Sequence, residues 1–481
     1  MSNTADPLSF AALTLHPELV KNLASLGYTV MTPIQAQGLP LILAGRDIIG
    51  QAKTGSGKTA AFGLGLLAKL KRKQFRVQAL VLCPTRELAD QVANAIRELA
   101  RTIPNVKVST LCGGMPFGPQ VAALEHGTQI VVGTPGRVDD HLSKGTLNLA
   151  NLTTLVLDEA DRMLEMGFQK ELDAIVDAAP VQRQTLLFSA TFPAEIGAVA
   201  SRIMRDPERV TAAAQHDSAT IEQHFYKAND SNARLTALRL LLLQQQVEST
   251  LVFCNTKKAT QELAEALREH NFSALAIHGD LEQKDRDRTL VRFANKSVAV
   301  LVATDVAARG LDIDALDVVV NYHIASDPEV HVHRIGRTGR AGSTGLAFTF
   351  HGDDERYKID RLGDYLSLVI EAEELPSKKL LETSPAQPRM TTLQIDAGKQ
   401  QKIRPGDILG ALTGEHGIAG HQVGKIKIFA DSSYVAVSRD AVSAALKKLG
   451  KGKLKGRSFK ARRIDGQPSN SRRLARRKHA R

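Results

Sequence analysis

Short apolar runs alternate with amphipathic stretches through the first 210 residues of the chain. Four of these runs have the length and apolar character of buried strands: 79–83, 130–132, 155–157 and 185–188. The stretch 87–101 repeats apolar residues at helical spacing: Leu88, Val92, Ile96 and Leu99. Since continuous apolar strands separated by helices are typical of parallel sheets covered on both faces, we expect residues 1–210 to form an α/β lobe with a doubly wound parallel sheet.

The same pattern restarts near residue 221. Further strands are expected at four apolar runs: 251–253, 274–277, 300–302 and 318–320. Helical stretches such as 257–270 separate these runs. Residues 211–219 are small and polar, so we interpret them as a linker between the first lobe and a second α/β lobe over 220–375.

A third region follows a segment with three prolines, 376–389, which we interpret as a second linker. The order of its expected elements is strand, helix, strand, strand, helix, strand. The strands are placed at 392–395, 423–429, 434–437 and 459–464, and the helices begin near Pro405 and Ala441. This split βαβ order predicts a small α+β domain of the RRM-like type over 390–464. Residues 465–481 lack apolar periodicity and are predicted to form a disordered basic tail.

The charge of the chain is concentrated at its C-terminal end. The 63 Lys and Arg residues exceed the 51 Asp and Glu residues by 12. Residues 451–481 hold 13 of the basic residues and one acid, so this segment alone carries the whole excess of +12. A local basic excess indicates a polyanionic partner for this end of the chain and says little about the rest.

The bulk composition excludes several classes of protein. A hydrophobic content of 43% is too high for a mainly disordered chain. No apolar run approaches the roughly 20 residues that a membrane-spanning helix needs, and the first ten residues lack the pattern of a signal peptide. The three cysteines are too widely spaced to suggest a disulfide framework or paired zinc ligands. We therefore expect a cytoplasmic monomer with no membrane partner.

The run 52–59, Ala-Lys-Thr-Gly-Ser-Gly-Lys-Thr, follows an apolar stretch and precedes a helical one. Glycine-rich backbone of this kind can wrap phosphates with its N–H groups at a helix N-terminus. Lys58 would then meet the β- and γ-phosphates, and the Thr59 hydroxyl would bind Mg²⁺. The strict sequence pattern of a phosphate-binding loop has glycine at the position of Ala52. Judged on this motif alone, residues 57–59 can therefore also be a Gly-Lys-Thr that occurs by chance in a turn and binds no phosphate.

An apolar strand at 155–157 ends in the acids Asp158 and Glu159. Carboxylates there suit the second half of a nucleotide site: Asp158 can hold Mg²⁺ through water, and Glu159 can orient or deprotonate the attacking water. The alternative is a helix start with acids near its dipole. In the second lobe, residues 333–340 place arginines three apart among glycines, which is typical of an arginine finger or of a solvated basic helix face.

Taken together, these segments resemble the DEAD-box ATP-dependent RNA helicases. The family takes its name from the one-letter code of the sequence Asp-Glu-Ala-Asp, which this chain has at residues 158–161. The resemblance spans about residues 10–365 and adds further motifs in the family order: 27–28, 32–35, 84–89, 113–114, 134–137, 189–191, 253–256, 283–286, 303–305 and 309–312. The alanine at position 52 is the family's own residue there. The resemblance implies two tandem RecA-like lobes and a need for ATP and Mg²⁺.

The resemblance also assigns roles to single residues. It implies an ATP-binding set of Tyr28, Gln35, Ala52, Thr54, Gly55, Ser56, Gly57, Lys58, Thr59 and Asp312. It implies a catalytic set of Lys58, Asp158, Glu159, His333, Arg337 and Arg340, with Mg²⁺ at Thr59 and Asp158. The residues that it implies in RNA contact are Arg86, Gly114, Thr134, Arg137, Arg286 and Thr304. Residues 189–191, Ser-Ala-Thr, match the segment that links hydrolysis to strand separation.

The third region is similar to the C-terminal RNA-binding domain of a bacterial subfamily that is specific for large-subunit (23S) ribosomal RNA. The aromatic-rich signature of base-stacking sheets is absent, since Tyr434 stands alone in its strand and Phe429 can belong to the core. RNA contact is therefore expected at basic residues: Lys425, Lys451, Lys453 and Arg457. A charge run is more often only a solvated face, which remains the alternative for any one of them.

The leading hypothesis is an RNA-stimulated ATPase that locally unwinds short RNA duplexes during large-subunit assembly. A different class of function is an RNA clamp or annealing chaperone whose affinity is regulated by nucleotide. The presence of Lys58, Glu159, the Ser-Ala-Thr segment and Arg337 with Arg340 favours the enzyme. A DNA helicase is a weaker option, because the residues alone do not show a preference for the 2′-hydroxyl.

Overall fold

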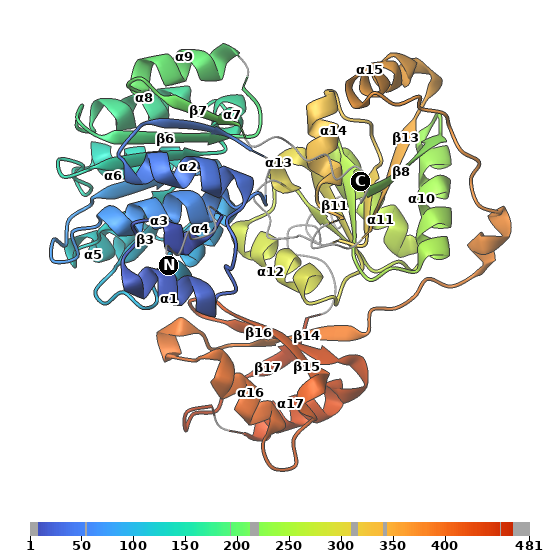
Figure 1. Ribbon diagram of the computed structural model, residues 1–481. Helices are drawn as coiled ribbons and strands as arrows, with labels where there is room; N and C mark the ends of the chain where they lie inside the picture. The colour runs from blue at the N-terminus through green and yellow to red at the C-terminus, as the bar shows by residue number, and fades with distance from the viewer. Residues whose placement is uncertain are drawn as a thin grey trace, which may run out of the picture. The chain divides into compact units, whose positions relative to one another are not determined.

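A computed structural model gives the structure of residues 8–52, 55–192, 194–211, 221–308, 316–339, 344–452 and 454–464 (Figure 1). The described residues divide into two compact units. The first contains those up to residue 211, and the second contains those from residue 221 onward. The second unit includes both an α/β lobe and a separate small sheet near the C-terminal end. The division of the whole chain into six segments stays a prediction.

The first unit is built on a seven-stranded parallel sheet in the order β3-β4-β2-β5-β6-β1-β7. Its strands are β1 (Ile48–Gln51), β2 (Ala79–Leu82), β3 (Val108–Leu111), β4 (Ile130–Gly133), β5 (Thr154–Asp158), β6 (Gln184–Ser189) and β7 (Glu208–Thr211). Its helices are α1 (Pro17–Ser25), α2 (Pro33–Leu43), α3 (Lys58–Lys69), α4 (Arg86–Leu99), α5 (Phe117–Glu125), α6 (Pro135–Ser143), α7 (Ala160–Glu165), α8 (Gln169–Asp177) and α9 (Ala194–Ile203).

Both faces of this sheet are buried, which explains why β2 is apolar at every position and why the middle of β5 is apolar. In β2, Val81 points into one hydrophobic core, while Leu80 and Leu82 point into the other. Because side chains alternate across a strand, a strand covered on both sides needs apolar residues throughout. Figure 1 shows helices on the two sides of the sheet.

The second unit begins with a six-stranded parallel sheet in the order β10-β11-β9-β12-β13-β8. Its strands are β8 (Ile221–Lys227), β9 (Thr250–Cys254), β10 (Ala274–Ile277), β11 (Val300–Thr304), β12 (Val318–Asn321) and β13 (Gly345–His351). Its helices are α10 (Ser231–Gln245), α11 (Lys257–Glu269), α12 (Gln283–Ala294), α13 (Asp305–Ala308), α14 (Pro328–Ile335) and α15 (Arg356–Leu366).

The C-terminal sheet has four antiparallel strands in the order β15-β16-β14-β17. Its elements are β14 (Met390–Ile395), α16 (Pro405–Thr413), β15 (Val423–Ile428), β16 (Ser433–Ser438), α17 (Val442–Lys451) and β17 (Ala461–Arg463). The predicted fold class, two parallel α/β lobes and a small α+β domain, is therefore confirmed. The predicted tail, 465–481, lies outside the described residues.

The pattern of apolar runs did not predict several of the strands, and the burial and composition of these strands explain why. Strands β3 and β7 are the two edges of the first sheet, and each has mostly partly buried or exposed residues. Strand β13 is buried, but Gly, Thr and His interrupt its apolar residues.

Among the residues that the structure describes, no helix has both the length and the apolar character needed to cross a membrane.

Candidate nucleotide and RNA site

The glycine-rich loop lies between the carboxyl end of β1 and the start of α3 at Lys58. Gly55 and Gly57 have φ angles of +83° and +93°, in the left-handed region that favours glycine. The Nζ atom of Lys58 donates a hydrogen bond of 2.9 Å to the carbonyl oxygen of Ala52, across the loop. Thr54 lies outside the described residues. The loop thus starts a helix and presents its N-terminus, as a phosphate-binding loop requires.

Gln35 connects the predicted adenine-reading segment to this loop. Its Oε1 accepts a hydrogen bond from the backbone N–H of Thr32 at 3.0 Å, and its Nε2 donates one to the carbonyl oxygen of Gly57 at 3.1 Å. Tyr28 is exposed, and its ring lies edge-on to the buried ring of Phe10 with centroids 6.2 Å apart. The structure therefore gives Gln35 a second task, holding the loop, beside the adenine contact that stays a prediction.

The two acids at the end of β5 differ in burial, since Glu159 remains partly exposed. Asp158 is buried, and its Oδ1 atom has no hydrogen-bond partner among the described residues. Burial raises the pKa of Asp158 to about 6, against the opposing effect of Lys58, whose charge lowers it. Glu159 takes a φ of +55° at the start of α7, an unusual conformation for a residue other than glycine. Strained backbone and a buried carboxylate at a strand end are typical of functional sites.

Two motifs that the sequence keeps about thirty residues apart are joined by Asp161. Its Oδ2 atom accepts hydrogen bonds from the N–H and the hydroxyl of Thr191, at 3.1 and 3.0 Å. Burial alone would raise the pKa of Asp161, but Arg162 and these two hydrogen bonds hold it below its usual value. The N–H of Ala52 also donates to the carbonyl oxygen of Ser189 at 3.1 Å. The glycine-rich loop, the acids and the Ser-Ala-Thr segment are thus physically connected.

The RNA-contact candidates of the first unit follow neighbouring strands of the sheet. Arg86 begins α4 after β2, Gly114 follows β3 with a φ of +73°, and Thr134 is the residue between β4 and α6. Arg137 donates through Nη1 to the carbonyl oxygen of Met115 at 3.0 Å. Since the carboxyl ends of parallel strands meet at one edge of the sheet, these candidates share an edge with the nucleotide loop.

The second unit holds the remaining helicase-motif candidates that the structure describes. Thr304 ends β11, and Arg286 of α12 donates through Nη2 to the carbonyl oxygen of Ala307 at 3.1 Å. His333 lies in α14, and Arg337 follows that helix. Asp312 and Arg340 lie outside the described residues.

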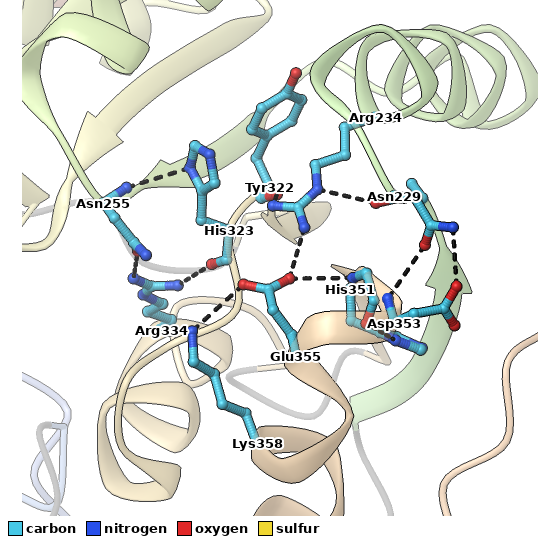
Figure 2. A network of polar contacts seen from close by, with 12 residues as sticks. Asn229, Arg234, Asn255, Tyr322, His323, Arg334, His351, Asp353, Glu355 and Lys358 are labelled. Atoms are coloured by element: carbon cyan, nitrogen blue, oxygen red, sulfur yellow. Dashed lines mark hydrogen bonds and ion pairs between the residues drawn. The ribbon is translucent and has the colours of Figure 1, made fainter.

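Arg334 is the residue of this motif that the sequence reading left without a role. It is buried, and its Nε and Nη2 atoms each bond one oxygen of Asp305 at 2.7 Å. The same guanidinium donates to the carbonyl oxygen of His323 at 2.7 Å and to the Oδ1 atom of Asn255 at 3.1 Å (Figure 2). It therefore fixes the loops that follow β9, β11 and β12. Its partners are far apart in the sequence, so spacing alone could not have found them.

A second buried pair lies nearby in the same unit (Figure 2). The Nη2 atom of Arg234 and the Oε2 atom of Glu355 are 2.5 Å apart, and both side chains are largely buried. Arg234 also donates to the carbonyl oxygen of Ala228, and Glu355 accepts from the N–H of Gly352 at 3.1 Å. The pair ties α10 to the start of α15, and it was also not foreseen from the sequence.

Comparisons with known proteins agree with this geometry. Family models match three segments in order: DEAD/DEAH box helicase over residues 32–199, helicase conserved C-terminal domain over 233–342, and DbpA RNA binding domain over 392–463. The chain is 53% identical to ATP-dependent RNA helicase DbpA of Escherichia coli (strain K12), over 93% of this chain and 97% of that protein. The chain belongs to the DEAD-box ATP-dependent RNA helicases.

Two further similarities place this helicase within the family. It is 46% identical to the DEAD-box ATP-dependent RNA helicase CshA of Geobacillus kaustophilus, over 71% of this chain and 73% of that protein. A solved structure of S. cerevisiae Dbp5 bound to RNA and ADP BeF3 is 30% identical, with a TM-score of 0.69, and covers 78% of this chain and 98% of that one. CshA and Dbp5 each match about three quarters of the helicase, whereas the relative from E. coli extends over its C-terminal domain.

The basic candidates of the helicase's C-terminal domain are surface residues where the structure describes them. Lys425 is exposed on β15, which is an edge strand. Arg457 is exposed in the turn before β17, where its backbone pairs with that of Leu454. Lys451 ends α17, and Lys453 lies outside the described residues. Their contacts with RNA stay predictions.

Proposed function

We propose that this helicase uses ATP to open short duplexes of 23S ribosomal RNA in the precursor of the large ribosomal subunit. The observation that carries the proposal is the match of residues 392–463 to the DbpA RNA binding domain, joined to a complete pair of helicase lobes. The resemblance of this third domain to a subfamily specific for large-subunit RNA supports that target. We further propose that the helicase works as a monomer in the cytoplasm.

In the proposed reaction, Lys58 and the N–H groups of the glycine-rich loop hold the β- and γ-phosphates of ATP. Glu159 orients the attacking water and takes its proton. Tyr28 and Gln35 hold the adenine. Support for these roles comes from the position of Lys58 at the start of α3 and of Glu159 at the carboxyl end of β5, two strands from β1 in the sheet.

The residues present fit a magnesium ion beside the phosphates. The Oδ1 atom of Asp158 is buried without a hydrogen-bond partner among the described residues, and Thr59 lies in the first turn of α3. Mg²⁺ usually keeps several water ligands and is held by one or two carboxylates together with the phosphates of its substrate. When bound, Mg²⁺ would neutralise charge on the phosphate oxygens.

Arg337 and Arg340 are proposed to complete the site as arginine fingers, with Asp312 on the ribose and His333 coupling the lobes. These residues belong to the second lobe, while Lys58 and Glu159 belong to the first. Hydrolysis would then require the two lobes to come together, and RNA held by both would promote it. Arginine fingers contribute roughly 10³- to 10⁵-fold in rate in related nucleotide hydrolases.

A Glu159→Gln variant tests the enzymatic proposal. It removes the proton acceptor but keeps the size of the side chain, so ATP and RNA should still bind while turnover stops. The control is Glu195→Gln, an exposed glutamate in the first turn of α9 of the same unit, which should behave like the parent. Strand separation by Glu159→Gln through many cycles would contradict the proposed role and would favour the RNA-clamp hypothesis.

A further inference from the structure

A cluster of positive charge lies in the first unit, in the loop 70–78 that joins α3 to β2. The loop holds four basic residues and one aromatic residue: Lys71, Arg72, Lys73, Arg76 and Phe75. The sequence has no acid at any position between Asp47 and Glu87. The cluster is therefore a local basic feature within the first 450 residues, which are neutral as a whole.

This loop lies at the amino edge of the sheet, opposite to the edge that carries the nucleotide loop. It precedes β2, while the loop 100–107 precedes β3 and the loop 126–129 precedes β4. These three neighbouring strands are parallel and start in register, since Ile130 pairs with both Ala79 and Val108. The three loops therefore meet at one edge. No residue of the proposed ATP and RNA sites belongs to them.

A buried glutamine holds the basic loop in one conformation. The Oε1 atom of Gln78 accepts a hydrogen bond of 2.8 Å from the N–H of Lys71. Its Nε2 atom donates to the carbonyl oxygens of Gln74 and Lys71, at 2.8 and 3.0 Å. Because Gln78 is buried, breaking these bonds would leave polar groups unpaired, and the loop is thereby held in place.

A second buried glutamine joins this loop to its two neighbours. The Nε2 atom of Gln129 donates to the carbonyl oxygens of Arg72 and Asn105, at 3.2 and 2.9 Å. Its Oε1 atom accepts a hydrogen bond from the N–H of Lys107 at 2.9 Å. The three loops thus form one ordered surface, which loses little conformational freedom when it binds a ligand.

Phe75 is an exposed aromatic residue on this surface. It is 44% exposed, and the Nζ atom of Lys107 lies 5.1 Å from the centre of its ring. Its backbone packs on Gly127, where φ is +81° and where a Cβ atom would lie 2.9 Å from the carbonyl oxygen of Phe75. The position of Phe75 is thus fixed while much of the residue stays accessible. An accessible aromatic ring among cations is suited to stacking on an unpaired base.

Most of the cations around Phe75 lack an acidic partner. Arg72 is paired with Glu18 at 3.2 Å. Four other exposed cations form no ion pair with any residue that the structure describes: Lys71, Lys73, Arg76 and Lys107. A surface that serves solubility alone normally mixes charges of both signs, whereas several unpaired charges of one sign attract a polyanion.

We infer that this surface binds a second segment of the RNA, with an unpaired base stacked on Phe75 and phosphates at the four unpaired cations. We call these five residues the amino-edge platform. RNA supplies both phosphates for the cations and a planar base for the ring, so the observations favour it over an acidic protein surface. The inference goes beyond the proposed function, because it does not depend on which RNA is the target.

The platform and the helicase motifs lie at opposite ends of the same strands. Strand β2 has four residues, so the two edges are separated by at least about 13 Å. An RNA that contacts both edges must therefore extend around the first unit. The platform would hold a looped or single-stranded segment beside the duplex that the motifs act on.

The first test removes two charges from the platform in the full chain. Lys71→Gln combined with Lys73→Gln should weaken binding of a long structured RNA at least several-fold. The slope of log affinity against log salt should fall by roughly 1.4 to 1.8, at 0.7 to 0.9 for each lost contact. The matched control is Lys378→Gln with Lys379→Gln, two neighbouring exposed lysines of the second unit. Equal losses in the two double variants would show that only net charge matters and would overturn the inference.

The second test examines the stacking of the ring. Phe75→Leu keeps an apolar side chain but removes the flat ring, so RNA affinity should fall about fivefold or more, while Phe75→Tyr should retain it. Loss of affinity in both variants would contradict stacking. Normal RNA affinity in Phe75→Leu and in the platform lysine variant would overturn the inference and would favour an acidic protein partner or a solvated face.

Both tests are made with a fragment of 23S ribosomal RNA and with a scrambled RNA of equal length. The platform reads phosphates and one base face, so the losses should be the same for the two RNAs. Equal affinity of the parent helicase for the two RNAs would refute the proposed target, while the losses in the variants would still decide whether the platform binds RNA. Losses confined to the 23S fragment would contradict a platform that binds without regard to sequence.

Discussion

Single buried polar side chains connect loops of this helicase that the sequence keeps far apart. Asp161 holds Thr191 through two hydrogen bonds, and Arg334 holds Asp305 through a bidentate pair. In both cases the charged group is removed from water, so its partners must remain in place. Each of these residues therefore acts on the site by positioning other groups. Such a positioning role is difficult to recognise from a single sequence, because the partners are distant along the chain.

Replacing Thr191 with valine should separate hydrolysis from strand opening. Valine keeps the size and the backbone N–H but removes the hydroxyl bond to Asp161, at a cost of about 1 kcal/mol in stability. We expect ATP turnover to persist while the amount of duplex opened per ATP falls. Thr191→Ser, which keeps the hydroxyl, is the control. Equal coupling in the two variants would show that the hydroxyl is not used.

Arg334→Gln should destabilise the second unit strongly, because it leaves the Asp305 carboxylate without its bidentate partner. The expected loss is about 3 kcal/mol in the free energy of unfolding, measured with urea. Arg356→Gln is a matched control, since Arg356 pairs with Asp360 where both side chains are mostly exposed. That variant should change stability by less than about 1 kcal/mol. Similar losses for both variants would contradict the argument from burial.

At the scale of elements, the nucleotide site depends on close contact between helix α2 and the glycine-rich loop that follows β1. Gly57 shows this best, because a Cβ atom there would lie 2.4 Å from the Nε2 atom of Gln35, which no real contact tolerates. Its φ of +93° would add strain for any other residue. The contact between α2 and the glycine-rich loop thus requires glycine at this position.

Gly57→Ala should therefore weaken ATP binding at least about tenfold, which corresponds to about 1.4 kcal/mol. Gly38→Ala is the control, because Gly38 lies in α2 with nothing within 4 Å of the position of the new Cβ. This control should bind ATP normally and unfold at a slightly higher urea concentration. Normal ATP affinity in Gly57→Ala would mean that the loop and α2 separate easily.

The pair between α10 and α15 predicts a pH dependence of stability. Burial would raise the pKa of Glu355, but the Gly352 N–H and Arg234 outweigh it and hold the pKa below the usual 4.5. A lowered pKa in the folded state means that the stabilisation is complete above that usual value and is lost as the pH falls through the folded value. Glu355→Gln should destabilise the second unit at pH 7 by about 3 kcal/mol, and the difference should shrink below pH 4.5. A difference independent of pH would contradict this.

At the scale of the whole molecule, charge and catalysis are separated along the chain. The first 450 residues are neutral, while 451–481 carry the excess of +12. Of the 13 basic residues in 451–481, six lie after residue 471 in the predicted tail and seven lie at the end of the RNA-binding domain, and the single acid Asp465 reduces the net charge to +12. Selectivity is therefore expected from the folded domain, and a general attraction to RNA from the tail.

Deleting residues 465–481 should weaken binding to all RNAs alike and reduce its dependence on salt. Each lost phosphate contact lowers the slope of log affinity against log salt by roughly 0.7 to 0.9, so six lost contacts would lower it by about 4 to 5 at most. The measurement is RNA affinity over a range of salt concentrations. Loss of selectivity for large-subunit RNA after this deletion would contradict the separation of roles.

The sequence could predict much of the fold and the location of the motifs. Strand β2 is buried and apolar throughout, β5 is buried and apolar in its three central residues, and the motifs follow these strands. What could not be predicted are contacts between distant polar residues, such as that between Asn295 and Thr392, or those by which Arg334 joins the loops after β9, β11 and β12. Such pairs leave no periodicity, because each partner looks like an ordinary surface residue in its own segment.

The central claim is that an ATP-dependent helicase is directed to large-subunit ribosomal RNA by its C-terminal domain. The most direct measurement is the ATPase rate of the full chain against fragments of 23S ribosomal RNA, each paired with a scrambled RNA of equal length and structure at fixed salt. We predict that at least one fragment gives half-maximal stimulation at a concentration about tenfold or more below its scrambled partner. Equal stimulation by all RNAs of equal length would contradict the claim.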